Sequence, residues 1–135
     1  MAMSETNYSQ TNSIETSLWT NNSPTSSFSE QVVTINNLET YDYLKFTYRT
    51  STSNSTSNSL IISMEDFIAL KASGHETINF FNLSCFISSV SYNRAIHNYD
   101  NGQVHFNYCV GSNSTTVNTN VIPLEIIGIK YILPK

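Results

Sequence analysis

Charged side chains are scarce in this sequence, and their scarcity excludes one class of partner. They make up 12% of the 135 residues, about half of the roughly 25% usual in globular proteins. Only six are basic, and the net charge is −4. Binding to a phosphate backbone needs clustered lysine and arginine side chains. The six basic residues are instead scattered along the chain: Lys45, Arg49, Lys71, Arg94, Lys130 and Lys135. We therefore expect no nucleic acid partner.

Cysteines and long apolar runs are also few. Two cysteines, Cys85 and Cys109, cannot build a disulfide framework and lack zinc-site spacing, so we expect two reduced thiols. No apolar run approaches the roughly 18 residues of a membrane span, so we expect no membrane insertion. Residues 1–17 lack the basic and apolar segments of a secretory signal peptide. We expect synthesis in a cytoplasm; a protein of this kind that acts outside a cell would leave by lysis or some other route.

Serine, threonine and asparagine replace the missing charges and supply roughly two residues in five. A surface of this kind hydrogen-bonds water and sugars but attracts charged partners weakly. Hydrophobic residues, at 39%, suffice for one core in a chain of this length. Residues 1–17 contain almost none of them. We interpret residues 1–17 as a flexible polar N-terminal arm and residues 18–135 as a single domain.

Apolar and polar residues alternate with a period of two through much of this domain, as Leu44, Phe46 and Tyr48 do with their polar neighbours. About eight such runs occur. The polar tract 50–59 is typical of a long exposed loop, and only residues 64–72 resemble a short helix. The pattern predicts an all-β fold, an antiparallel β-sandwich of the jelly-roll type with at most one short helix. A barrel is the alternative.

The sequence Asp100-Asn101-Gly102 predicts a β-hairpin. A three-residue loop with Gly102 in the left-handed conformation sets Ile96 opposite Phe106, whereas a two-residue loop sets apolar residues against polar ones. The three-residue loop predicts that Cys109 lies on the outer face. It also predicts a core face of Val90, Tyr92, Ile96, Val104, Phe106, Tyr108 and Val110.

The same register predicts the positions of three candidate site residues, His97, His105 and Arg94. His97 lies opposite His105, with Cβ atoms about 4.5–5.5 Å apart. The pair could supply two ligands to a transition metal, particularly across a trimer axis, although the hairpin face offers no third ligand. The alternative is two histidines on a polar face or interface, and we expect no cofactor. Arg94 falls on the core face opposite Tyr108, either as a structural arginine stacked on a ring or in a polar ligand pocket.

Three tyrosines, Tyr41, Tyr43 and Tyr99, fall in turns or outside the core pattern. An exposed tyrosine ring can stack on the face of a sugar while amides and hydroxyls bond its oxygens. With Arg94, these tyrosines are our candidate saccharide-binding residues. Catalytic patterns are missing: the chain has no G-x-S-x-G motif, and its carboxylates do not form a glycosidase pair by local spacing. We expect no enzyme activity.

Three stretches carry a resemblance to a known class of domain. They are residues 18–28 (LWTNNSPTSSF), 41–46 (YDYLKF) and 122–130 (IPLEIIGIK). Over residues 18–131 the chain resembles a domain in virion proteins of tailed phages and prophages of low-GC Gram-positive hosts. The resemblance implies a β-sandwich at the end of a tail-fibre, baseplate or head-fibre protein, commonly a homotrimer. Such domains contact the host surface or decorate the particle. The shared stretches contain no ligand-binding residue that can be matched.

The resemblance implies a phage virion surface domain, and the polar, charge-poor composition favours a saccharide as its ligand. Its expected partners are a host cell-surface saccharide and other virion proteins, and receptor binding would be multivalent through a homotrimer. The alternative is a structural role in capsid decoration or fibre assembly without a ligand, and a glycan hydrolase ranks third. A groove lined by tyrosine, asparagine and serine would favour binding. A flat exterior with a large apolar subunit interface would favour the structural role.

Overall fold

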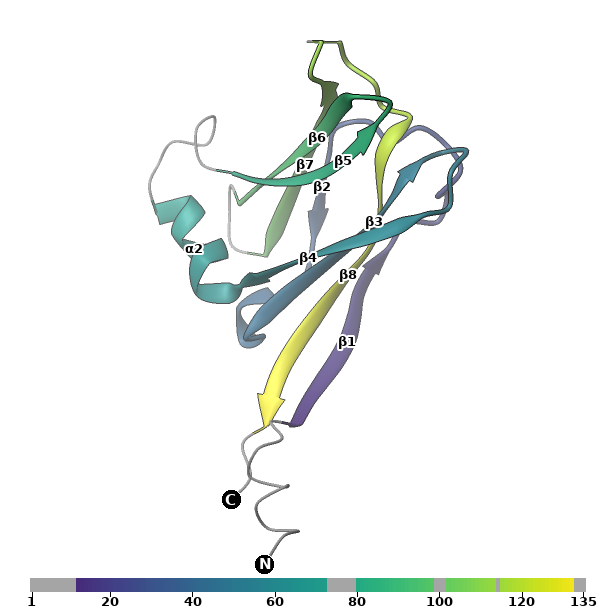
Figure 1. Ribbon diagram of the computed structural model, residues 1–135. Helices are drawn as coiled ribbons and strands as arrows, with labels where there is room; N and C mark the ends of the chain where they lie inside the picture. Colours follow the sequence, from purple (N-terminus) through teal and green to yellow (C-terminus); the bar gives the residue numbers. More distant parts are fainter. Residues whose placement is uncertain (1–11, 73–79, 99–101, 114, 133–135) are drawn as a thin grey trace, which may run out of the picture.

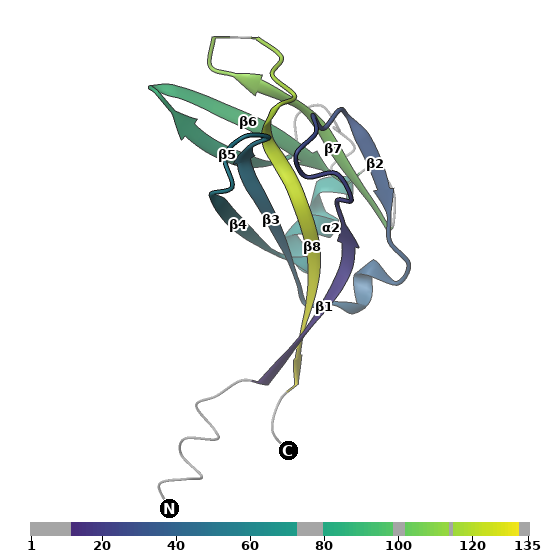
Figure 2. The same ribbon diagram turned by 90° about the vertical axis from the view of Figure 1, so that its right-hand side faces the viewer.

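The computed structural model describes residues 12–72, 80–98, 102–113 and 115–132. Over these residues, eight strands form two antiparallel four-stranded sheets that pack face to face (Figures 1 and 2). The first sheet has the order β1 (Asn12–Thr20), β8 (Asn120–Ile132), β3 (Tyr43–Ser51), β4 (Ser57–Ser63). The second has the order β2 (Gln31–Thr34), β7 (Gln103–Gly111), β6 (Val90–His97), β5 (Phe81–Ile87). The predicted antiparallel β-sandwich is confirmed.

The outer strands are nested, and the inner strands are not. The first strand lies beside the last and the second beside the second-last, in different sheets, as in a jelly roll. The inner strands are joined as hairpins, β3 with β4 and β5 with β6. Two short helices complete the described fold: the 3-10 turn η1 (Leu38–Thr40) and α2 (Met64–Ala72), the helix expected from the sequence.

Helix α2 closes one end of the sandwich (Figure 1). Its Phe67 side chain is fully buried, and the ring centroid lies 6.5 Å from that of Phe46 in β3. The amide nitrogen of Asn98, just after β6, donates to the Phe67 carbonyl at 3.0 Å. The helix therefore joins the two sheets through one apolar and one polar contact. No helix in the described part of the chain is long and apolar enough to cross a membrane.

The core between the sheets follows the period-two pattern. In β3 the alternate residues Leu44, Phe46 and Tyr48 are all buried. Phe106 of β7 packs edge-on against Phe46 and Phe28, with ring centroids 6.2 and 5.5 Å apart. Each such pair adds about 0.5–1.5 kcal/mol beyond the apolar area that it buries. Aromatic contacts across the interior therefore hold the two sheets together.

Strand β1 begins earlier than expected. Residues 12–17, predicted to belong to a flexible arm, are strand residues paired with the end of β8, from Asn12 opposite Ile132 to Ser17 opposite Ile127. Their side chains are exposed, and a backbone ladder needs no apolar side chains, so composition did not reveal them. The two strands run together past the rest of the sandwich (Figures 1 and 2). Residues 1–11 lie outside the described residues.

The β6–β7 hairpin contains a bulge that the sequence did not predict. Ile96 faces Phe106 and His97 faces His105, as expected. The register then shifts, because two residues of β7, Asn107 and Tyr108, stand opposite Ala95. Beyond the bulge, Arg94 pairs with Cys109 and not with Tyr108.

This bulge reverses the faces of the following residues. Cys109 is fully buried, whereas Tyr108 is 43% exposed and Val110 is only half-buried. The predictions that Tyr108 and Val110 lie in the core and that Cys109 lies outside are therefore wrong. Both cysteines are free, as expected.

The buried Cys109 gives the fold a pH dependence. Burial raises the pKa of its thiol to about 11, although the Arg94 guanidinium opposes the shift. The folded-state pKa lies above the unfolded value, so the stabilisation is complete below the unfolded pKa and is lost as pH rises toward 11. Between pH 8 and pH 11, the unfolding free energy should fall by about 1–2 kcal/mol more in the wild type than in Cys109→Ala. Urea denaturation at both pH values measures this difference, and equal losses would contradict it.

Candidate functional site

The outer face of the second sheet carries a groove of about 290 Å³. We call it the amide groove, because three asparagine side chains line it. Its described lining residues are Phe80, Asn82, Asn93, Ala95, His97, Asn107, Tyr108 and Val110. None of these side chains is a carboxylate, a lysine or an arginine. The groove therefore offers amides and aromatic rings to a ligand.

Strand register and the bulge together build this groove. Asn82 of β5 faces Ala95 of β6, while Asn107 and Tyr108 of β7 both oppose that alanine from the other side. A regular strand would send Asn107 and Tyr108 to opposite faces, whereas the bulge lets both line the groove. The small Ala95 side chain thus lies between an asparagine on one side and an asparagine–tyrosine pair on the other.

The three asparagine side chains differ in how many hydrogen bonds they already make within the protein. The Asn93 side chain accepts from the Ser84 hydroxyl at 2.6 Å and donates to the Ser91 hydroxyl at 3.2 Å. The Asn107 side-chain oxygen accepts from the Tyr108 backbone N–H at 2.9 Å, and its amide nitrogen has no partner among the described residues. The Asn82 side chain makes no hydrogen bond with a described residue. Asn82 and Asn107 can therefore bond a ligand, and Asn93 is held in place.

Two partly exposed aromatic rings border the amides. Phe80 is 41% and Tyr108 43% exposed. The Phe80 ring lies 5.7 Å from the His97 ring, centroid to centroid. Aromatic rings beside amide groups are well suited to an amphipathic ligand whose apolar face stacks while its polar edge bonds.

Arg94 lies inside the sandwich behind the groove and is fully buried. Its guanidinium donates to the carbonyls of Val121 at 2.8 Å, Asn107 at 2.7 Å and Asn120 at 3.1 Å. It lies 5.1 Å from the Phe28 ring centroid, which takes the place of the expected Tyr108. Burial lowers its pKa to about 10, which leaves it protonated at neutral pH. Of the two roles predicted for Arg94, this geometry is that of a structural arginine, and it holds the bulge from within.

The predicted histidine pair is present, with the His97 and His105 ring centroids 5.6 Å apart. Both residues are buried, at 4% and 8% exposed. His105 Nε2 lies 3.5 Å from the Glu30 carboxylate, a salt bridge when the histidine is protonated. The described residues include no group of three or more His, Cys, Asp or Glu side chains arranged to hold a metal ion. A metal at His97 and His105 therefore stays a prediction, and His97 contributes instead to the wall of the amide groove.

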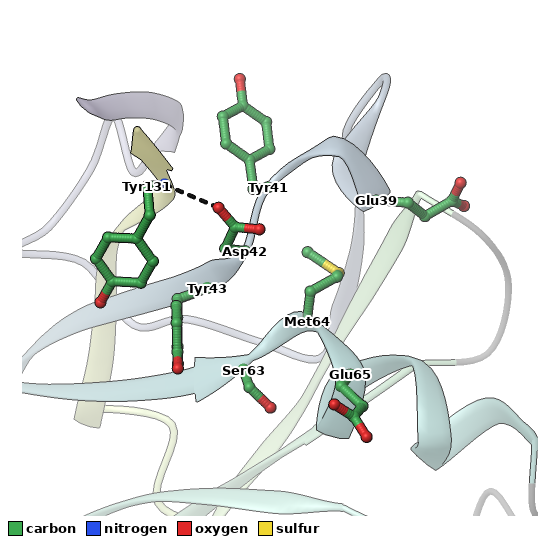
Figure 3. A pocket seen from close by; sticks show the side chains of 8 residues that line it. All are labelled: Glu39, Tyr41, Asp42, Tyr43, Ser63, Met64, Glu65 and Tyr131. Carbon is green, nitrogen blue, oxygen red and sulfur yellow. Dashed lines mark hydrogen bonds between the residues drawn. The ribbon is translucent and has the colours of Figure 1, made fainter. Parts of the chain in front are cut away.

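A second concavity, of about 600 Å³, lies beside η1, the start of β3, the junction of β4 with α2, and the end of β8. We call it the tyrosine pocket (Figure 3). Its lining residues are Glu39, Tyr41, Asp42, Tyr43, Ser63, Met64, Glu65 and Tyr131. Two of the predicted ligand-binding residues, Tyr41 and Tyr43, thus line one pocket, in the company of three carboxylates.

Packing contacts of the rings hold the tyrosines of this pocket in place. Figure 3 shows Tyr41 pointing to one side of the chain, and Tyr43 and Tyr131 to the other. The Tyr43 and Tyr131 rings meet edge to face, with centroids 5.2 Å apart. The Tyr41 ring lies against Gly128, where an added Cβ would be 2.6 Å from a ring carbon. Glycine at 128 is therefore what allows Tyr41 to pack onto β8.

The predicted site residues do not all lie in one place in the structure. Arg94 is in the core and Tyr99 lies outside the described residues. Sequence reasoning missed Asn82, Asn107 and Tyr108, which come together only through cross-strand register and the bulge.

Comparison with known proteins identifies no relative of this chain. No protein-family model, no curated protein and no solved structure matches the chain. What the fold defines is a class, the antiparallel β-sandwich. The resemblance of residues 18–131 to virion domains stays a prediction.

Proposed function

We propose that the protein is a phage virion surface domain that binds a neutral host cell-surface saccharide in the amide groove. The observation that carries this proposal is the chemistry of the groove: three asparagine amides and two part-exposed aromatic rings, with no carboxylate, lysine or arginine among its described lining residues. Neutral sugars are bound by such groups, because their C–H faces stack on rings and their hydroxyls bond amides.

The dimensions of the groove support a short stretch of glycan. Its volume of about 290 Å³ is close to the lower end, about 300 Å³, of known small-molecule sites. A single shallow site of this size is expected to bind weakly, with a Kd of about 1 mM, or about −4 kcal/mol. Binding by a homotrimer, present in many copies on a particle, would multiply this affinity. A role in multivalent attachment therefore suits a weak individual site.

The groove also favours adhesion over the other two functions considered. Decoration of a capsid without a ligand needs no groove of amides and rings. Hydrolysis of a glycoside needs two carboxylates across the scissile bond, and the described lining residues include none. We propose binding without cleavage, on a virion released by lysis.

The proposal predicts that Tyr108→Ala weakens attachment. Fluorescently tagged protein is incubated with host cells, and isolated wall polysaccharide is added as competitor. We expect polysaccharide to displace the wild type and Tyr108→Ala to bind about tenfold more weakly, the equivalent of about 1.4 kcal/mol, because a stacking ring is lost. Phe86→Ala is the matched control, since Phe86 is an exposed ring of the same sheet, 73% accessible, that lines neither the groove nor the tyrosine pocket.

Two results would count against the groove. If Tyr108→Ala binds cells as tightly as the wild type and Phe86→Ala do, the site lies elsewhere. If the oligomeric wild-type protein binds no host cell, the adhesin function fails and a structural part of the particle remains.

A further inference from the structure

The tyrosine pocket has a chemistry that a neutral saccharide does not need. Three of the ten acidic residues in the chain line it, Glu39, Asp42 and Glu65, and its described lining includes no basic residue. None of the three forms an ion pair with a described residue. Lys130 is directed to the Thr40 carbonyl, at 2.8 Å, and not to these carboxylates. In a chain with so few charges, this pocket concentrates negative charge around a concave, aromatic surface.

The N-terminus of α2 opposes this charge only in part. The helix begins at Met64, and the Ser63 hydroxyl accepts from the Asp66 N–H at 3.1 Å as its cap. A helix N-terminus carries the equivalent of about half a positive charge. Glu65 in the first turn already offsets it, and Glu39 and Asp42 come from other elements. The pocket therefore remains negative.

Hydrogen bonds hold both the backbone and the carboxylate of Asp42 in place in the pocket. Its backbone N–H donates to Ile129 and its carbonyl accepts from Met64, both at 2.8 Å. One oxygen of its carboxylate accepts from the Tyr131 backbone N–H at 2.8 Å (Figure 3). The other oxygen has no hydrogen-bond partner among the described residues. The carboxylate is thus held in position at the Tyr131 backbone within the pocket that the Tyr43 and Tyr131 rings also line, with one oxygen left for a ligand.

We propose that the tyrosine pocket binds an alkylammonium group. The cation would lie against the Tyr43 and Tyr131 rings, whose faces attract it, and beside the free oxygen of Asp42. The Met64 side chain offers a polarisable, adaptable surface for alkyl substituents. The volume of about 600 Å³ leaves room for the rest of the molecule that carries the ammonium group. This inference does not rest on the saccharide proposal, because it concerns another sheet, other residues and another ligand.

The test is a titration of the wild-type protein with three small probes. The ring resonances of Tyr43 and Tyr131 are followed by NMR as choline, ethanolamine or 3,3-dimethylbutan-1-ol is added, the last being a neutral isostere of choline. We expect saturable shifts with choline or ethanolamine at a Kd of about 1–10 mM, and about tenfold weaker binding of the isostere. Added sodium chloride should weaken amine binding, because salt screens exposed charges. The relative affinities of the two amines distinguish a quaternary from a primary ammonium source.

Substitutions locate the binding and separate it from the amide groove. Asp42→Asn keeps an acceptor for the Tyr131 N–H but removes the charge, so we expect about tenfold weaker choline binding. Tyr43→Leu should weaken it similarly. Glu30→Gln is the matched control, since Glu30 lies near His105 in the other sheet, and Tyr108→Ala should also leave choline binding unchanged.

Three outcomes would overturn the proposal. The first is equal binding of choline and its neutral isostere. The second is the absence of saturable shifts with either amine up to about 0.1 M, a hundredfold above a Kd of 1 mM. The third is binding of a lysine-rich peptide at this pocket without binding of either amine, which would make it a protein-docking surface. Failure of any of these tests leaves the saccharide proposal unaffected.

Discussion

Replacing Arg94 with methionine is expected to lower the free energy of unfolding by about 3–5 kcal/mol, the usual cost of stranding buried polar partners. Three backbone carbonyls lose their donor at once, those of Asn107, Asn120 and Val121. Methionine fills a similar length but donates no hydrogen bond, and each unsatisfied buried carbonyl costs about 1–3 kcal/mol. Since a domain of this kind is stable by only about 5–15 kcal/mol, the variant should lose a large share of its stability.

Urea denaturation followed by the fluorescence of the single tryptophan measures this loss. Trp19 is a suitable reporter, because its ring centroid lies 6.0 Å from that of Phe28 and 5.5 Å from that of Phe106. Arg49→Met is the matched control. Arg49 also donates to three backbone carbonyls, those of Ser51, Thr52 and Asn54, but it is only half-buried.

Water can replace Arg49 at those carbonyls, so we expect the control to lose at most about 1 kcal/mol. Equal losses in the two variants would show that hydrogen-bond number, and not burial, determines the cost. Arg94→Lys tests the geometry separately. A lysine keeps the charge but has no planar fork, so it cannot serve three diverging carbonyls and should recover little of the stability.

The parts of the fold that the sequence predicted are those governed by local periodicity. In β3 the alternation of Leu44, Phe46 and Tyr48 correctly gave both the strand and its buried face. Helix α2 lies where its residues were expected. The pairing of His97 with His105 followed from the loop length and the choice of register. Each of these features depends on residues within a few positions of one another.

The bulge in β7 shows where such reasoning stops. One extra residue, in the pair Asn107–Tyr108, leaves the sequence alternating as before while the faces exchange. Tyr108 and Val110 therefore looked like core residues and Cys109 like a surface residue. The one available signal was Cys109 itself, because free cysteine is among the most frequently buried residue types. A register that buried Cys109 would have required the bulge.

Exposed strands were missed for a different reason. The tract 50–59 was predicted to be a loop, yet β3 extends to Ser51 and β4 begins at Ser57. A strand with both faces in solvent has no apolar alternation to mark it. The turn at Ser88 and Ser89 was missed as well. Both residues have positive φ, 50° and 68°, a conformation for which asparagine and glycine, not serine, are the usual signals.

The candidate sites also differ in whether local sequence pattern or long-range strand pairing determines them. Tyr41 and Tyr43 were found because they lie outside a local pattern, and both do line a pocket. The amide groove was not found, because its asparagines come from three strands whose mutual register the sequence does not encode locally. A site built across a sheet depends on long-range pairing, and the bulge that completes this one is held by Arg94 from the opposite side of the sheet.

Gly102, at the start of the β7 side of the hairpin, leaves no room for a side chain. Its φ is +76°, and an added Cβ would lie 2.8 Å from the Ile35 backbone oxygen. The Ile35 N–H donates to the Gly102 carbonyl at 2.6 Å, so the hairpin and the end of β2 are joined at this point. Gly102→Ala is expected to lower the unfolding free energy by about 2–4 kcal/mol, from the left-handed backbone and the clash together. Urea denaturation measures the loss.

Gly111→Ala controls for the loss of glycine as such. Its backbone has no positive φ, and the closest atom to an added Cβ is the end of the Asn113 side chain, at 2.8 Å, which can rotate away. We expect a loss of at most about 1 kcal/mol, and a loss equal to that of Gly102→Ala would contradict the argument.

Gly102→Asn then separates the cost of the left-handed backbone from the cost of the Cβ contact. Asparagine tolerates the left-handed conformation but carries the same Cβ, so recovery of most of the stability would assign the cost to the backbone dihedrals. An undiminished loss would assign it to the contact with the Ile35 backbone oxygen, which β2 can relieve only by moving away from the hairpin.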